Sequence, residues 1–184
     1  MLPSLQNRPI SFTGLKTPGV VVGLGEARVL KAGVGRPSDD VLVAFGLGSC
    51  VALCLWDRDA AVAGMAHIVL PGEDPFRVPN PKFARSALPA LIALMRAEGA
   101  TADPQRLVAR LTGGSQILAL DPIAGIARIG LANAEAILEE LDEAGVRVQA
   151  VDLGGSAGRN VWFDPREGGR IRVRAIGSRA DRFL

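Results

Sequence analysis

The sequence is poor in aromatic residues, histidine and cysteine. Aromatic residues make up 4% of its 184 residues, tyrosine is absent, and the chain has one histidine and two cysteines. The core must therefore consist mostly of alanine, valine, leucine and isoleucine. His67, Cys50 and Cys54 do not supply the four ligands of a structural zinc site, so we expect no bound metal.

The sequence also lacks strong net charge, a secretory signal and a long apolar run. The formal net charge is only +2, and no basic run or aromatic platform favours nucleic-acid binding. The longest apolar candidate for a membrane span, residues 87–95, is too short and contains Pro89. The N-terminal residues carry no apolar signal segment. We therefore expect a cytoplasmic protein with no membrane insertion and with reduced thiols.

The hydrophobic content of 48% and the length of 184 residues allow a substantial core. Residues 1–17 are expected to form a flexible N-terminal tail and residues 18–184 a single domain. The expected strands cover residues 19–23, 41–45, 50–56, 61–67, 107–112, 146–151, 160–164 and 170–176. Clustered hairpins together with helices favour an α+β sandwich over a doubly wound sheet. Its sheets should be mixed, mostly antiparallel, and flanked by helices.

Two long helices are predicted from capping residues and apolar spacing. Asn80-Pro81 has the pattern of an N-cap followed by proline, and Gly99 marks the end of that helix. Pro89 should kink or split it. Asn133 is the expected N-cap of the second helix, which ends at Gly145.

Cys50 and His67 stand at the two ends of a predicted β-hairpin. Residues 50–56 and the strand that begins at Ala61 flank the polar turn 57–60. If the turn centres between Arg58 and Asp59, Cys50 lies directly opposite His67, within reach for a nucleophile and its base. Such a pairing would lower the pKa of the cysteine. A slip of one residue would place the two side chains on opposite faces.

Other readings of these residues remain open or are less favoured. A buried cysteine often only packs, which is our interpretation of Cys54. Residues 46–51 carry valine where a dinucleotide fingerprint needs its third glycine, and a strand follows. Residues 154–158 lack the Lys-Ser/Thr pair of a phosphate loop. Both segments are better explained as glycine turns.

Several segments together resemble the CheD family of chemoreceptor glutamine deamidases. The most specific are Gly46-Leu-Gly-Ser-Cys-Val-Ala-Leu-Cys-Leu-Trp-Asp57, Ala63-Gly-Met-Ala-His-Ile-Val-Leu-Pro71 and Asp152-Leu-Gly-Gly-Ser-Ala-Gly-Arg-Asn-Val-Trp-Phe-Asp164. Weaker similarities are Val22-Gly-Leu-Gly-Glu26, Leu111-Thr-Gly-Gly114 and Ile129-Gly-Leu-Ala-Asn133. The similarity covers most of residues 19–176.

The resemblance implies a cytoplasmic hydrolase that needs no cofactor. It would convert glutamine side chains on the cytoplasmic helices of a chemoreceptor, a methyl-accepting chemotaxis protein, to glutamate. Cys50 would be the nucleophile and His67 its base, with a thioester intermediate. Backbone amides near Gly48 and Ser49 are candidate oxyanion donors. A CheC-type phosphatase is an implied partner.

The chain departs from the family at one catalytic position. The family has a threonine six residues before the cysteine, and this chain has Ala44. Ser49, Thr112, Ser115 or a backbone carbonyl could orient the imidazole instead. Without a substitute, the protein could be a weak or inactive adaptor that binds receptors or a CheC-type partner. A receptor methylesterase would use the same chemistry.

Overall fold

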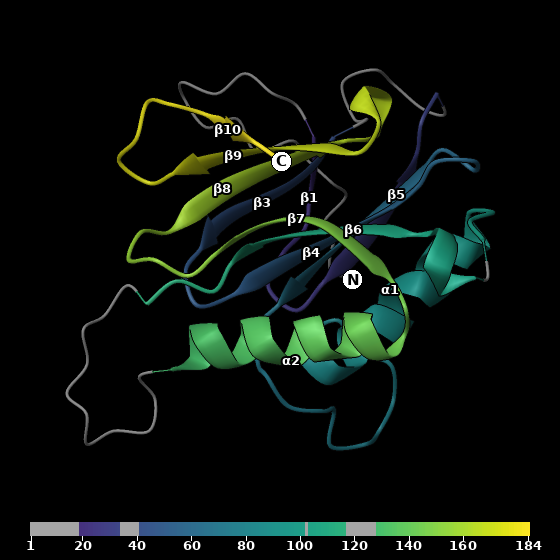
Figure 1. The fold of residues 1–184 in the computed structure, drawn as a ribbon, viewed down its shortest axis with the longest axis horizontal. Helices are drawn as coiled ribbons and strands as arrows, with labels where there is room; N and C mark the ends of the chain where they lie inside the picture. Colours follow the sequence, from purple (N-terminus) through teal and green to yellow (C-terminus); the bar gives the residue numbers. More distant parts are fainter. Residues whose placement is uncertain (1–18, 34–40, 102, 117–127) are drawn as a thin grey trace, which may run out of the picture.

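The structure is a computed structural model that describes residues 19–33, 41–101, 103–116 and 128–184. The expected tail, residues 1–17, lies outside the described residues. Two five-stranded sheets and two long helices make up the fold (Figure 1). None of the helices in the described ranges is long and apolar enough to cross a membrane.

Sheet A has the strand order β1-β3-β8-β9-β10, and sheet B has the order β2-β5-β4-β6-β7. The strands of sheet A are β1 (Val20–Val21), β3 (Leu42–Leu47), β8 (Arg159–Asp164), β9 (Arg170–Ala175) and β10 (Arg182–Phe183). Those of sheet B are β2 (Ala27–Lys31), β4 (Val51–Asp57), β5 (Val62–Ile68), β6 (Val108–Gly113) and β7 (Arg147–Leu153). The β1–β3 and β6–β7 pairs are parallel, and the other strand pairs are antiparallel.

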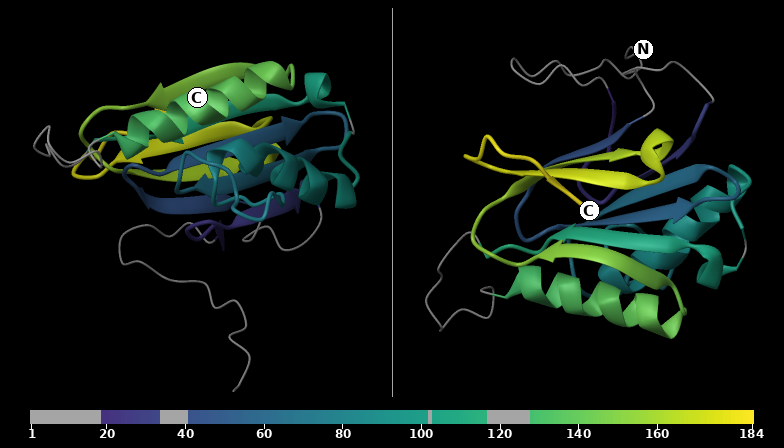
Figure 2. Two further views of the ribbon diagram at one scale, coloured as in Figure 1. Left: turned by 90° about the horizontal axis from the view of Figure 1, so that it is seen from below. Right: turned by 45° about the horizontal axis from the view of Figure 1, so that its top comes forward.

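The elements form three layers. Helices α1 (Ala84–Ala97) and α2 (Ile129–Glu143) cover one face of sheet B, and sheet A covers the other (Figures 1 and 2). Short 3₁₀ turns, η2 (Pro104–Arg106) and η3 (Pro165–Glu167), complete the described elements. The expected α+β sandwich of mixed, mostly antiparallel sheet with flanking helices is confirmed.

Strand β4 lies at the centre of sheet B and is buried on both faces. Its odd-numbered residues Val51, Leu53 and Leu55 join the core under the helices, and Ala52, Cys54 and Trp56 join the core between the sheets. This division follows from the alternation of side chains along a strand. The interpretation of Cys54 as a packing residue agrees with its 1% exposure.

The expected register of the β4–β5 hairpin is wrong by one residue in each strand. His67 pairs with Ala52, and Cys50 lies just before the first paired residue, Val51. Asp57 belongs to β4 because its carboxylate accepts hydrogen bonds from the amides of Asp59 and Ala60, at 3.0 and 3.1 Å. The turn is therefore one residue later than predicted. Since the pairing shifts by two positions in all, Cys50 and His67 keep the same face of the sheet.

Both helix starts were also predicted wrongly. Helix α1 begins at Ala84, because the Asn80 side chain accepts from the amide of Lys82 in a separate turn before the helix. The helix continues through the exposed Pro89, so the predicted split is wrong. Helix α2 begins at Ile129, and Asn133 lies buried inside it.

Arg159 holds the glycine loops at one end of the two sheets. The residue is 5% exposed, and its Nε donates to the carboxylate of Asp152 at 3.1 Å. Its other nitrogens donate to the carbonyls of Gly154 and Ala157 and to the Ser115 hydroxyl. The loops that follow β6 and β7 are thus fixed by one buried cation with multiple partners.

Replacing Arg159 with methionine should lower the free energy of unfolding by about 3–5 kcal/mol, because a nearly buried Asp152 loses its closest ion-pair partner. Urea denaturation measures the loss. The matched control is Arg166→Met, which breaks a pair with Asp164 whose side chains are 44% and 20% exposed. That control should cost less than about 1 kcal/mol. Similar losses in both variants would contradict a special role for the Arg159 network.

Candidate active site

The structure places Cys50, His67 and Thr112 around the first residues of β4. Ala52 pairs with His67 on β5 and with Thr112 on β6, so these three side chains share one face of sheet B. That face is the one covered by sheet A, because Ala52 belongs to the core between the sheets. Half-buried Cys50 precedes Ala52 by two residues and packs against the same core. Cys50 is therefore diagonal to His67 across the hairpin.

His67 is held by the segment that crosses from sheet A to sheet B. Its ring Nδ1 lies 3.2 Å from the carbonyl oxygen of Val22, which follows β1. Its backbone amide donates to the carbonyl of Glu26 at 2.9 Å, and its carbonyl accepts from the amide of Gly25 at 3.0 Å. The histidine is thus fixed at its backbone and its ring by one short connection.

The contact with Val22 determines which ring nitrogen of His67 can act as a base. A carbonyl can only accept, so Nδ1 carries the hydrogen and Nε2 keeps its lone pair. Nε2 is buried and has no hydrogen-bond partner among the described residues. Burial lowers the pKa of His67, against smaller opposing effects of the Val22 hydrogen bond and the charge of Glu26. The ring is therefore neutral at pH 7 and ready to accept a proton.

The three carbonyl groups of the Gly48-Ser49-Cys50 loop are all fixed by neighbouring elements. The carbonyl of Gly48 accepts from the amide of Ser115 at 2.7 Å, and that of Cys50 from the amide of Gly114 at 2.8 Å. The carbonyl of Ser49 accepts from the Asn133 side chain at 2.9 Å. None of the hydrogen bonds found among the described residues is donated by the amides of these three loop residues. As far as the described residues go, these amides are available as donors to a negative charge.

Asn133 holds the cysteine loop in place from inside helix α2, whereas the sequence predicted it as the N-cap of that helix. Its side-chain nitrogen donates to the carbonyls of Ser49 and Val69, which joins the cysteine loop to the end of β5. The spacing could have indicated a buried role, because a polar residue four positions before Ile137 lies on the apolar face of the helix. Its oxygen is buried with no hydrogen-bond partner among the described residues.

The other candidate residues differ in their surroundings. The hydroxyl of Thr112 is buried and has no hydrogen-bond partner within the described ranges. Ser115 is turned away, because its hydroxyl donates to the carbonyl of Ala157 and accepts from Arg159. Ser49 is exposed. Ala44 is completely buried in the core between the sheets.

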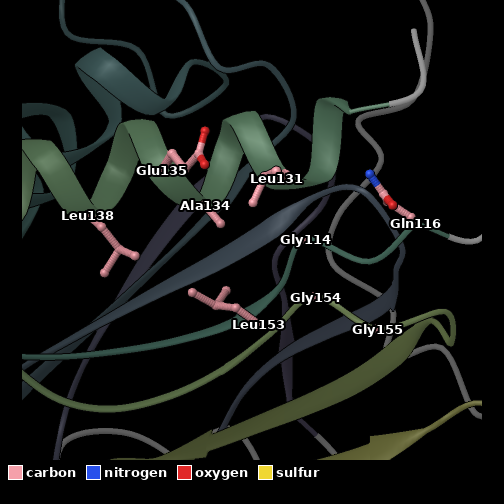
Figure 3. Close-up of a pocket in the computed structure, with 9 residues that line it drawn as sticks. All are labelled: Gly114, Gln116, Leu131, Ala134, Glu135, Leu138, Leu153, Gly154 and Gly155. Atoms are coloured by element: carbon pink, nitrogen blue, oxygen red, sulfur yellow. The ribbon is translucent and has the colours of Figure 1, made fainter. Parts of the chain in front are cut away.

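A groove of about 340 Å³ lies beside the cysteine loop, between α2 and the glycine turns after β6 and β7 (Figure 3). Leu131 and Leu138 of α2 project toward Leu153 across it, and Glu135 and Gln116 add polar groups. Gly114 joins the groove to the site, since its amide holds the Cys50 carbonyl.

Burial raises the pKa of the Cys50 thiol. This direction is opposite to the one expected from a cysteine–histidine ion pair. Because the thiol has a raised pKa and the imidazole on the same face a lowered pKa, both groups rest uncharged. These pKa directions favour proton transfer during the attack over a preformed thiolate.

Several known proteins with similar sequences share one family. A family model described as "CheD chemotactic sensory transduction" matches residues 70–175. A protein of Caldanaerobacter subterraneus named "Probable chemoreceptor glutamine deamidase CheD" is 38% identical over 158 residues, covering 85% of this chain and 92% of its own. A protein of the same name from Archaeoglobus fulgidus is 37% identical over 152 residues, with coverages of 81% and 88%.

Among solved structures, the hypothetical protein YfiH of Bacillus licheniformis aligns with a TM-score of 0.42 and 15% identity. The alignment covers 76% of this chain and 65% of that one. A likeness at this level carries no argument about the site.

The alkylation rate of Cys50 by iodoacetamide should keep rising as the pH passes the ordinary cysteine pKa of about 8.5, because burial delays thiolate formation. Peptide mass spectrometry measures the rate at each pH. Cys54→Ala should give the same curve, since the Cys54 thiol is buried and unreactive. A rate that reaches its plateau near neutral pH would instead indicate a thiolate–imidazolium pair.

Proposed function

The chain belongs to the CheD family, and we propose that it hydrolyses glutamine side-chain amides of a chemoreceptor to glutamate. The names of its relatives support the reaction and the substrate. The observation that carries the proposal is the imidazole of His67, which Val22 fixes with Nε2 unprotonated on the face that Cys50 shares. That arrangement suits a nucleophile and its general base.

In the first half of the proposed reaction, the Cys50 sulfur attacks the carboxamide carbon of the glutamine. The S–H proton passes to Nε2 of His67 as the carbon–sulfur bond forms. The resulting imidazolium then gives this proton to the departing nitrogen, so ammonia leaves when the carbon–nitrogen bond breaks. The product is a thioester between the substrate and Cys50, and His67 is neutral again.

In the second half, a water molecule attacks the thioester. His67 accepts the proton of the water and returns it to the sulfur as the carbon–sulfur bond breaks. Glutamate is released and the Cys50 thiol is restored. The thiol proton leaves with ammonia and a proton of the water replaces it on the sulfur, so the two halves together are a hydrolysis without any change of oxidation state.

Each tetrahedral intermediate carries a negative oxygen, for which the loop before β4 offers donors. The amides of Gly48, Ser49 and Cys50 donate no hydrogen bond among the described residues, while their carbonyls are held away by other elements. Donors fixed in this way need no reorganisation as charge develops. Removing one such donor in other enzymes costs about 10²–10³-fold in kcat.

Thr112 is a candidate for binding the substrate amide. A buried hydroxyl without a partner is destabilising by about 1–3 kcal/mol, and such groups often have a functional reason. Thr112 flanks Ala52 on the side opposite His67. In the proposed complex its hydroxyl accepts a hydrogen bond from the NH₂ group of the glutamine.

The adaptor alternative rests on the absence of an orienting hydroxyl at Ala44. The Val22 carbonyl weakens it, because this group accepts an orienting hydrogen bond from the segment after β1. The methylesterase alternative differs only in the leaving group. The proposal also includes a cytoplasmic location, a single CheD-like domain over residues 18–184 and a CheC-type phosphatase as a partner. Co-elution of the two purified proteins would test the last of these.

Incubation with cytoplasmic receptor fragments should convert specific glutamines to glutamates, detected by peptide mass spectrometry. Cys50→Ala should abolish turnover, and His67→Asn should lower kcat by about 10²–10⁴-fold through loss of the general base. Cys54→Ala is the matched control and should retain activity. Turnover that survives Cys50→Ala would contradict the mechanism. Loss of methyl groups in place of amide conversion would identify an esterase, and binding without either reaction an adaptor.

Ala44→Thr should not raise the deamidation rate, because Val22 already orients His67. The larger residue should instead lower the free energy of unfolding by about 1–3 kcal/mol, since Ala44 is fully buried. Ala44→Val is the matched control, with similar added volume and no hydroxyl. A gain in kcat with threonine but not with valine would show that Val22 does not replace the missing hydroxyl.

A further inference from the structure

A second pocket, here called the arginine pocket, lies at the end of β4 that is opposite to the cysteine loop. It has a volume of about 490 Å³ and lies between the β4–β5 turn, the starts of β6 and β7, and η3. Seven residues of β4 separate it from Cys50, a distance of about 20 Å for an extended strand. Four arginines line it: Arg58, Arg110, Arg147 and Arg166. No aspartate or glutamate is among its described lining residues.

Arg110 forms the inner part of this arginine pocket. It pairs with Cys54 in the sheet, so its side chain is on the face of sheet B that sheet A covers. The residue is 7% exposed, and its Nε and Nη1 have no hydrogen-bond partner among the described residues. Among the described residues its hydrogen-bond partner is Gln149, whose side-chain oxygen accepts from Nη2 at 2.6 Å.

A guanidinium in this position is costly to the folded protein. Arginine stays charged in proteins, and a buried charge is tolerated when an opposite charge or several hydrogen bonds compensate it. The neutral oxygen of Gln149 satisfies only one of five N–H donors. The neighbouring Arg147 repels Arg110. An anion bound in the pocket would compensate the buried charge of Arg110 and so explain why the folded protein tolerates it.

The remaining arginines surround the opening of the pocket. Arg58 and Arg147 are exposed, and neither forms an ion pair in the described structure. Arg166 is paired with Asp164 at 2.8 Å, which compensates one of the four charges. The pocket therefore keeps a surplus of positive charge, which suits a ligand with more than one negative charge.

We propose that the arginine pocket binds a small molecule through its phosphate group, with Arg110 as the buried ligand and Arg58 and Arg147 at the opening. The planar guanidinium fork matches the spacing of phosphate oxygens and can bind two of them at once. A phosphate oxygen takes the place of the Gln149 oxygen on Nη2 and reaches Nε or Nη1 as the side chain adjusts.

The pocket has room for more than a bare phosphate. Its volume falls within the range of about 300–1,000 Å³ that is usual for small-molecule sites. Trp56 adds an apolar wall. Gly169 lies against this ring so closely that an added Cβ would come within 2.6 Å of it. An organic phosphate whose carbon part contacts Trp56 fits these features better than a free ion.

Isothermal titration calorimetry of the full chain with inorganic phosphate, glucose 6-phosphate and glucose tests this proposal at fixed ionic strength. We expect saturable binding of at least one phosphate compound and no binding of glucose. Tighter binding of the ester would identify an organic phosphate as the ligand class, and equal affinity would identify phosphate itself. Absence of binding by both, or heat changes that sodium chloride reproduces, would overturn the proposal.

Arg110→Gln should weaken phosphate binding by at least about tenfold, since charge-assisted hydrogen bonds are lost. It should also raise the melting temperature of the ligand-free protein, because a buried charge is removed. Arg179→Gln is the control: it removes the same charge from an exposed position outside the pocket and should leave binding unchanged.

A purely structural Arg110 would give the reverse pattern. The Arg110→Gln protein would melt at a lower temperature and bind phosphate as before, which would overturn the assignment. If this variant does not fold, the double variant Arg58→Gln/Arg147→Gln at the opening replaces it. Unchanged phosphate affinity in that double variant would equally contradict the site.

Discussion

The candidate active site depends on one hydrogen bond between the two sheets, from Nδ1 of His67 to the carbonyl of Val22. Val22 follows β1 of sheet A, while His67 lies in β5 of sheet B. Packing of the sheets therefore determines the tautomer of the imidazole. Substituting Val22 would leave its backbone carbonyl in place. The group that orients the imidazole therefore does not depend on which side chains surround it. Under the proposed mechanism, this contact orients the base in a chain that has alanine at position 44.

The loop that carries Cys50 is likewise held through its backbone carbonyls. Its carbonyls are bound by amides of the turn after β6 and by the side chain of Asn133, and Arg159 in turn fixes that turn through the Ser115 hydroxyl. The loop amides donate no hydrogen bond within the described ranges, which suits donors to an oxyanion. The Thr112 hydroxyl and Nε2 of His67, which have no hydrogen-bond partner in the described part of the chain, lie in the same region. Three of the five buried side-chain atoms without a partner among the described residues thus belong to His67, Thr112 and Asn133 near the candidate site, and the other two belong to Arg110.

The sequence predicted the layers of the fold and the placement of Cys50 and His67 on one face of a hairpin, because both follow from side-chain alternation along strands. The register was predicted wrongly because Asp57 is still part of β4 while its carboxylate accepts hydrogen bonds from two amides of the turn. The sequence could not identify Val22, since any residue has a carbonyl and only the meeting of two sheets places this one. The second strand, β2, was also missed, and with it the crossover that holds the histidine.

The state of the His67 ring is the most direct test of this account. Because the chain has a single histidine, nitrogen-15 labelling of histidine in tag-free protein gives signals from one imidazole. At pH 7 the account predicts a neutral ring with the hydrogen on Nδ1, and a titration midpoint below the ordinary pKa of about 6.5. A hydrogen on Nε2, or an imidazolium at pH 7, would contradict the proposed base.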